Sequence, residues 1–171
     1  MSFENIDASN WIWNIPREDM KGRRRGHAVP LVVQAQRVLE VRRELAPGTY
    51  VFPVRRRSAA PHVVNPTGWW RDLTTAAGLT DVTIHDIRRT TASWMAMTGA
   101  TEAIIAQFLG HKRQGVTARY ARLDVAAVRS AAQIAVDTML DRAGVAHERS
   151  PERSDVPYGT IVPLARRAGG G

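Results

Sequence analysis

Four side chains in the second half of the chain are of types that can do chemistry on a phosphate. His85 and Arg88 lie three residues apart, so a helix would place them on one face. His111 follows a Leu-Gly pair, and Tyr120 comes nine residues after it. A phenol is a nucleophile when positive charge helps it to ionise, an arginine can bind phosphate oxygens, and a histidine can transfer protons. Together these residues could break a phosphodiester bond.

Each of these residues, taken singly, also has an ordinary structural explanation. An exposed His-x-x-Arg pair is common on helices, His111 could be a loop or capping residue, and Tyr120 could belong to an amphipathic surface or the core. The order and spacing of all of them in one basic chain favour a single site.

Positive charge is concentrated in one quarter of the chain. The net charge is +8 and the isoelectric point is about 11.1. The segment from Arg17 to Arg57 holds eleven Lys and Arg residues against four Asp and Glu. Only Lys21 and Lys112 are lysines, and arginine forks suit two-point contacts with phosphate. A solvated basic face would explain the charge alone, but such a chain is also typical of proteins that bind double-stranded DNA.

Composition excludes several other classes of protein. The chain has no cysteine, which excludes disulfides and thiolate chemistry. No apolar run is long enough to cross a membrane, and the first residues have no signal-peptide pattern. We therefore expect a cytoplasmic protein, associated with the nucleoid when bound to DNA. No acidic cluster is spaced near the candidate residues, so we expect neither a metal nor another cofactor.

Periodicity and turn residues predict an α+β fold that is mainly helical, with a small antiparallel hairpin. Residues 10–16 and 26–33 read as strands joined by a basic tip, and residues 50–52 as a short extended piece. Helices are predicted over residues 38–45, 65–77, 83–99, 101–109, 116–120 and 124–140, the third of them starting at Thr83 or Asp86. On the last helix Val125, Val128, Ile134, Val136 and Leu140 are the predicted apolar positions. Residues 1–144 would form the domain, and residues 145–171 a disordered tail.

The constellation resembles the C-terminal catalytic domain of the tyrosine recombinases, the phage integrases and their relatives. His85 and Arg88, with the Arg89-Thr90 that follows, match the family's His-x-x-Arg box. Leu109-Gly-His111 matches its Leu-Gly-His box, and Tyr120 falls at its nucleophile. The segments 13–16 and 27–31 look like its β-hairpin, whose turn presents a lysine.

The resemblance implies a role for each matched residue. Tyr120 would attack DNA and form a 3′-phosphotyrosine, with Arg88, His85 and His111 around the phosphate and Lys21 as the acid. It implies site-specific recombination on double-stranded DNA by a tetramer assembled there. The residues expected to bind DNA are arginines: Arg23, Arg24, Arg25, Arg55, Arg56, Arg57 and Arg89.

The same resemblance implies a first catalytic arginine upstream of Phe3–Asp7, together with an N-terminal clamp domain. We therefore expect a domain that is incomplete at its N-terminus and slow on its own. An alternative is a catalytically impaired DNA-binding remnant of an integrase. A metal-dependent nuclease using His85 and His111 is a weaker alternative, because nothing acidic completes a metal site.

Overall fold

The computed structural model describes residues 1–20, 26–54, 60–111 and 124–148. A three-stranded antiparallel sheet opens the chain, in the order β1 (Ile6–Asp7), β2 (Ile12–Ile15), β3 (His27–Pro30). Short 3-10 turns, η1 (Phe3–Asn5) and η2 (Arg17–Asp19), precede β1 and follow β2. In the β2–β3 pair Trp13 lies opposite Val29 and Ile15 opposite His27. The predicted hairpin is therefore present.

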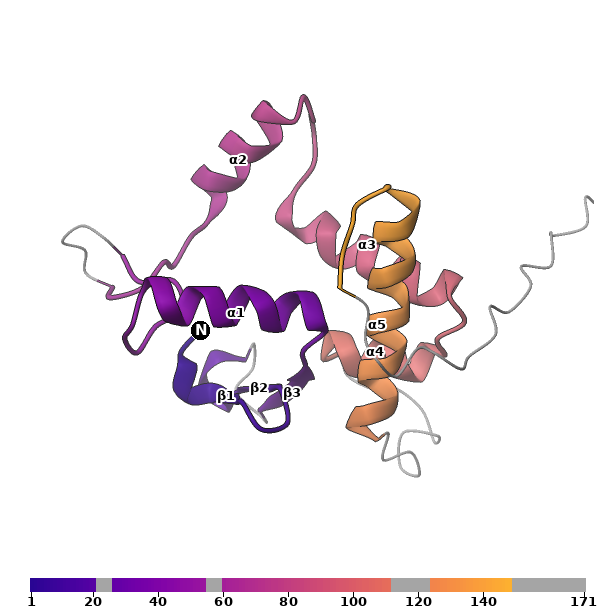
Figure 1. The fold of residues 1–171 in the computed structure, drawn as a ribbon, viewed down its shortest axis with the longest axis horizontal. Coiled ribbons are helices and arrows are strands. Elements are labelled where there is room, and N and C mark those ends of the chain that lie inside the picture. Colours follow the sequence, from indigo (N-terminus) through magenta and orange to yellow (C-terminus); the bar gives the residue numbers. More distant parts are fainter. Residues whose placement is uncertain (21–25, 55–59, 112–123, 149–171) are drawn as a thin grey trace, which may run out of the picture.

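Helices make up most of the remaining described structure. They are α1 (Val33–Leu45), α2 (Thr67–Ala76), α3 (Ile84–Met97), α4 (Glu102–Leu109) and α5 (Val125–Arg142). Helix α1 runs along the sheet, and α3, α4 and α5 gather beside it (Figure 1). This architecture confirms the predicted α+β class, mainly helical with a small antiparallel sheet. The predicted helix over residues 116–120 lies outside the described residues.

Local capping residues begin three of the helices at positions that the sequence predicts. Thr83 accepts from the N–H of Asp86, Thr101 from that of Ile104, and Asp124 from that of Ala126. Asn65 accepts from the N–H of Thr67, and α2 begins at Thr67, two residues after the start of the predicted range. Each helix start of this kind is set by residues adjacent in sequence.

Two hydrophobic clusters form the interior of the described part. One lies between the sheet and α1 and is built on Phe3, Leu31, Leu39 and Val51. The other joins α3, α4 and α5 through Met95, Ala132 and Ala135, with Ile104, Ile105 and Phe108 packed against them. The site residues on α3 and α4 thus stand on the second cluster.

Some element boundaries differ from the sequence prediction. Strand β3 ends at Pro30, and Val33 already begins α1, whereas the sequence predicted a strand to residue 33 and a helix from 38. Residues 50–52 form no strand with a ladder; Tyr50 makes an isolated bridge with Ser2. The two-residue strand β1 is an addition, since so short a strand leaves no periodic signal.

The buried face of α5 is also more polar than predicted. Val128 is buried as expected, but Ile134, Val136 and Leu140 are only half-buried. Small and polar side chains occupy the fully buried positions instead: Ala132, Gln133, Ala135 and Asp137. Because α3 packs closely against α5, small alanine side chains fit between the two helices. The buried polar side chains are stabilised by hydrogen bonds.

Those polar groups form a network that joins α1, α5 and the segment after α5. Gln133 Oε1 accepts from the backbone N–H of Val33 at 2.8 Å, and Gln133 Nε2 donates to Asp137 Oδ1 at 2.8 Å. Arg37 binds both carboxylate oxygens of Glu148, at 2.7 and 3.0 Å. Residues 145–148, predicted to start the tail, therefore contact α1. The division of the chain at residue 144 remains a prediction.

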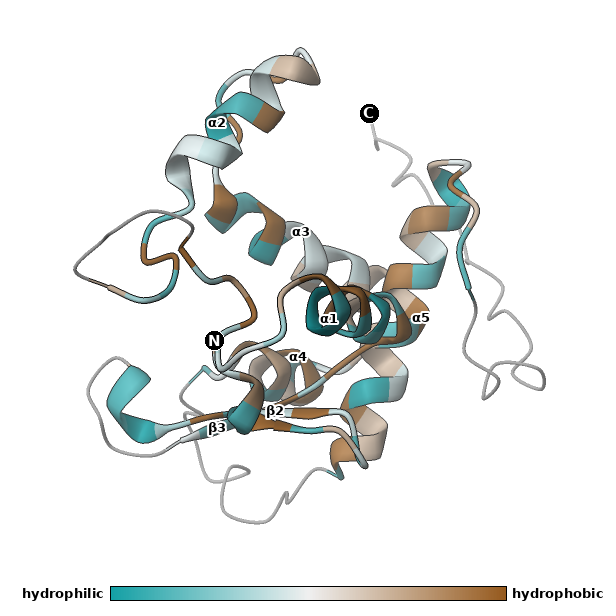
Figure 2. Ribbon diagram, turned by 60° about the vertical axis from the view of Figure 1, so that its left-hand side comes forward, coloured by the Kyte–Doolittle hydropathy of each residue, from teal (hydrophilic) through white to brown (hydrophobic). Residues whose placement is uncertain are grey.

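Helix α2 stands apart from this body (Figures 1 and 2). Only Thr74 is buried and Trp70 half-buried along it, and Trp69 is 63% exposed. A side-chain hydrogen bond from Trp70 Nε1 to the carbonyl of Val82 at 2.7 Å and a backbone one from Leu79 to the carbonyl of Thr74 at 2.8 Å tie it to the segment that leads into α3.

Candidate active site

Helix α3 carries the His-x-x-Arg pair close to its N-terminus. A capping box starts the helix: Thr83 accepts from the N–H of Asp86, and the carboxylate of Asp86 accepts from the N–H and hydroxyl of Thr83 at 2.9 and 2.6 Å. His85 and Arg88 then lie three apart, on one face, and both are exposed. The sequence prediction that they share a face is confirmed by the helix.

The C-terminus of α4 brings His111 toward that pair. Gly110 ends the helix in the left-handed region with φ +66°, which glycine adopts without strain. The guanidinium of Arg88 donates to the carbonyl of Leu109, two residues before His111. Helix α3 and the Leu-Gly-His turn thus meet through Arg88, and His111 follows this contact with its side chain exposed.

His27 is a residue near this turn that the sequence did not single out. It lies on β3, and its Nε2 is 3.3 Å from the carbonyl oxygen of Phe108. Its ring also packs so closely on Gly110 that a Cβ there would lie 2.9 Å from His27 Cδ2. No short motif could have revealed this contact, because the two segments are 81 residues apart.

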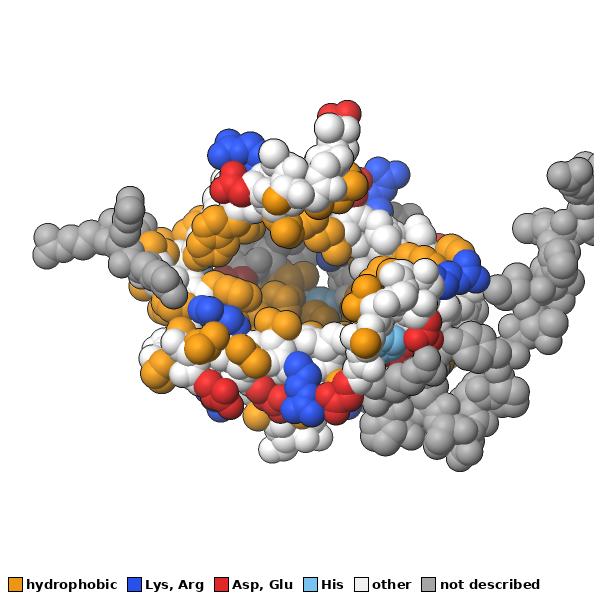
Figure 3. Space-filling view, turned by 45° about the horizontal axis from the view of Figure 1, so that its top comes forward, with side chains coloured by type: hydrophobic (Ala, Val, Ile, Leu, Met, Phe, Trp, Pro, Cys, Tyr) orange, Lys and Arg blue, Asp and Glu red, His pale blue; other side chains and the backbone are white. Residues whose placement is uncertain are grey.

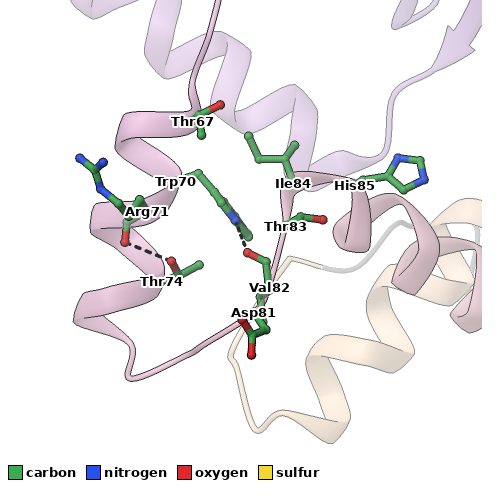
Figure 4. A pocket seen from close by; sticks show the side chains of 9 residues that line it. All are labelled: Thr67, Trp70, Arg71, Thr74, Asp81, Val82, Thr83, Ile84 and His85. Atoms are coloured by element: carbon green, nitrogen blue, oxygen red, sulfur yellow. Dashed lines mark hydrogen bonds between the residues drawn. The ribbon is translucent and has the colours of Figure 1, made fainter.

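An open hollow lies between α2 and the start of α3 (Figure 4). Its lining residues come from α2, from the segment before α3, and from the first turn of α3: Thr67, Trp70, Arg71, Thr74, Asp81, Val82, Thr83, Ile84 and His85. Trp70 points across it toward the carbonyl of Val82, whereas the ring of His85 points away from α2. His85 therefore lies at the edge of the hollow.

Hydrophobic side chains surround the hollowed face of the molecule (Figure 3). Large exposed ones occur at helical spacing on α1, α2 and α3: Val38, Val41 and Leu45; Trp69 and Leu73; Ile84 and Ile87. Apolar stripes of this kind are uncommon on a monomer's surface and mark faces that other chains or segments cover. The face around α2 is therefore not a uniformly basic surface.

Two charged neighbours influence the first turn of α3. Hydrogen bonds from the Thr83 side chain and backbone lower the pKa of Asp86, and the charges of Arg89 and His85 lower it further. Arg89 Nη1 lies 3.6 Å from Asp86 Oδ1, with 75% of its side chain exposed. Asp86 thus remains anionic and supports the helix N-terminus, while Arg89 keeps most of its surface in solvent.

Several predicted site residues lie outside the described residues. These are the predicted nucleophile Tyr120, Lys21, and the arginines Arg23, Arg24, Arg25, Arg55, Arg56 and Arg57. Their roles stay predictions. Within the described ranges no group of three or more His, Asp or Glu side chains could hold a metal ion.

The sequence matches a known family over most of its length. The model of the phage integrase family matches residues 1–127. No curated protein and no solved structure matches the chain. The α+β architecture and the match together place the chain in a class of DNA-recombining proteins. The chain belongs to the phage integrase family, so site-specific recombination of DNA is its general function. No helix in the described part has the length and hydropathy needed to cross a bilayer.

Proposed function

We propose that this chain cuts and rejoins DNA through a covalent 3′-phosphotyrosine at Tyr120. The contact between Arg88 and the carbonyl of Leu109 carries the proposal, because it joins the His-x-x-Arg helix to the turn that bears His111. Tyr120 follows that turn by nine residues in the sequence. Membership of the phage integrase family supports the same reaction class.

The proposed residues account for each step of the reaction. The Tyr120 oxygen attacks phosphorus, and the bond from phosphorus to the 5′ oxygen breaks. A phenol with a pKa of about 10 needs a positive environment to ionise at neutral pH, and Arg88 supplies one. Arg88 also neutralises the non-bridging oxygens as charge builds up in the transition state. The departing 5′ oxygen takes a proton from Lys21. Rejoining reverses these steps: a 5′ hydroxyl attacks the phosphotyrosine and releases Tyr120.

The two histidines would act on the same phosphate. His85, one helical turn from Arg88, is placed to exchange the phenol proton or donate a hydrogen bond. His111 would donate a further hydrogen bond to a phosphate oxygen. Both side chains are exposed in the described structure, as residues that meet a large ligand must be. The bond energy is conserved in the phosphotyrosine, so the proposed cycle needs no nucleotide.

DNA binding would rest on arginines around this site. Arg89 is exposed beside the His-x-x-Arg face, and the basic segments 23–25 and 55–57 would contact the phosphate backbone. Exchange between two duplexes requires four strand cuts, so we propose a tetramer assembled on DNA.

A nicked suicide duplex, whose cleaved fragment diffuses away, tests the proposal. The purified chain should form a protein–DNA adduct that survives denaturation, and Tyr120→Phe should abolish it while DNA binding persists. Lys21→Ala should leave affinity nearly unchanged and remove cleavage. Binding without any adduct would contradict the proposal and favour the impaired, DNA-binding remnant.

A further inference from the structure

The end of α4 is held by two side chains from other elements. The last four carbonyls of a helix have no partner within it. In α4 the carbonyl of Ala106 accepts from the N–H of His111 at 2.9 Å, and that of Gln107 from the N–H of Gly110 at 3.1 Å. The two remaining carbonyls, of Phe108 and Leu109, face His27 and Arg88. His27 and Arg88 thus approach neighbouring carbonyls of one turn.

The position of His27 is fixed independently of this turn. It pairs with Ile15 in the sheet, so its backbone is part of the β2–β3 ladder. Gly26 before it lies so close to β2 that a Cβ would be 2.8 Å from the carbonyl oxygen of Ile15. A rigid strand therefore presents the His27 ring to α4.

The contact between His27 and the turn combines a hydrogen bond with tight packing. A carbonyl can only accept, so Nε2 of His27 must carry the hydrogen that it shares with Phe108. The ring also fills the space where a side chain on residue 110 would lie, since an added Cβ would be 3.0 Å from Nε2. Both contacts act on the residues immediately before His111.

We propose that His27 is a positioning residue for the DNA cleavage reaction, acting through His111. It holds the C-terminal turn of α4 against the sheet and so sets where His111 meets the phosphate. The inference rests on the proposed function, because it assigns His27 to that same site. Arg88 performs the equivalent contact from α3, but Arg88 also touches the phosphate in the proposed reaction, whereas His27 does not.

A double-mutant cycle on the rate of adduct formation tests this inference, with the full chain and saturating suicide duplex. His27→Phe keeps a ring over Gly110 but removes the hydrogen-bond donor. The half-buried carbonyl of Phe108 then lacks its partner, so cleavage should slow about tenfold. His27→Gln returns an N–H donor and should recover most of that rate. His62→Phe, a histidine stacked on Tyr50, is the matched control and should leave the rate unchanged.

The cycle distinguishes positioning from a general loss of structure. In a His111→Ala background, His27→Phe should change the rate by less than about twofold, because coupled residues are not additive. In a His62→Phe background its full effect should persist. Effects that multiply with His111→Ala, or that vanish in the His62→Phe background, would overturn the inference while leaving the proposed function intact. A wild-type chain that forms no adduct would overturn both. Circular dichroism of each variant checks that it folds.

Discussion

Gln133 on α5 caps the start of α1 from 100 residues away. Its side-chain oxygen accepts from the N–H of Val33 at 2.8 Å, while its amide nitrogen binds Asp137, which is fully buried. Val32, the residue before α1, has no side chain able to cap the helix. The amide of Gln133 thus joins the start of α1 to α5, beside the hydrogen bond from Gln34 to Asp137 at 3.2 Å.

Gln133→Ala should therefore destabilise the protein. The substitution leaves a backbone donor and a buried carboxylate short of a partner, which costs about 1–3 kcal/mol. Urea unfolding followed by circular dichroism measures the change. Thr75→Ala, on the exposed side of α2, should alter stability by no more than about 0.5 kcal/mol. Equal effects of the two substitutions would show that the Gln133 network contributes little.

Arg88 and Arg89 should separate catalysis from binding. If Arg88 contacts the phosphate as proposed, Arg88→Ala should slow adduct formation roughly 10²- to 10³-fold at saturating DNA, because a preorganised charge is lost. Arg89→Ala should weaken DNA binding with little effect on the saturated rate, because its exposed side chain contacts only Asp86 among the described ion pairs. The comparison uses single-turnover cleavage beside a binding titration. A larger rate loss from Arg89→Ala would reverse the two assignments.

Binding to duplex DNA should depend strongly on salt and little on sequence. Phosphate contacts release counterions, so affinity should fall steeply between about 50 and 200 mM salt. Fluorescence anisotropy with two unrelated duplexes measures both properties. Replacing Arg55, Arg56 and Arg57 by alanine should lower affinity for both duplexes alike. An affinity that stays constant over this salt range would refute a phosphate-binding role for the basic segments.

The capping box of α3 should make stability depend on pH in the acid range. Hydrogen bonds from Thr83 hold the pKa of Asp86 below its ordinary value of 3.8. A carboxyl with a lowered pKa in the folded state stabilises the protein above its unfolded pKa, and that contribution is lost as the pH falls through the lowered value. The wild type should exceed Asp86→Asn in stability at pH 7, and the difference should shrink below about pH 4. Thermal melts at a series of pH values measure this difference in stability. A difference that stays constant with pH would show that the Asp86 carboxylate is not its source.

Local signals in the sequence predicted most helix starts and the shared face of the candidate pair. Thr83, Thr101 and Asp124 cap their own helices within three residues, and His85 and Arg88 needed only the helical repeat. The start of α1 escaped prediction because its cap, Gln133, is remote. The predicted apolar stripe of α5 failed in part because Asp137 and Gln133 are buried through hydrogen bonds that hydropathy does not reveal.

The contact of His27 with Phe108 could not be predicted for a similar reason. The contact depends on how β3 packs against α4, and no sequence pattern in either segment indicates that the two are in contact. The family resemblance predicted which residues contact the phosphate, but it gave no information about residues that position them from other elements.

The isolation of α2 has a consequence for how the molecule opens. A helix with one buried residue and, within the described part of the chain, one side-chain hydrogen bond to the segment after it has a low free energy of local unfolding. Its amides should exchange with deuterium well before those of α3 and α5, and proteases should cleave there first. Because the same helix forms one wall of the hollow beside His85, we expect the edge of the candidate site to rearrange without unfolding of the two hydrophobic clusters.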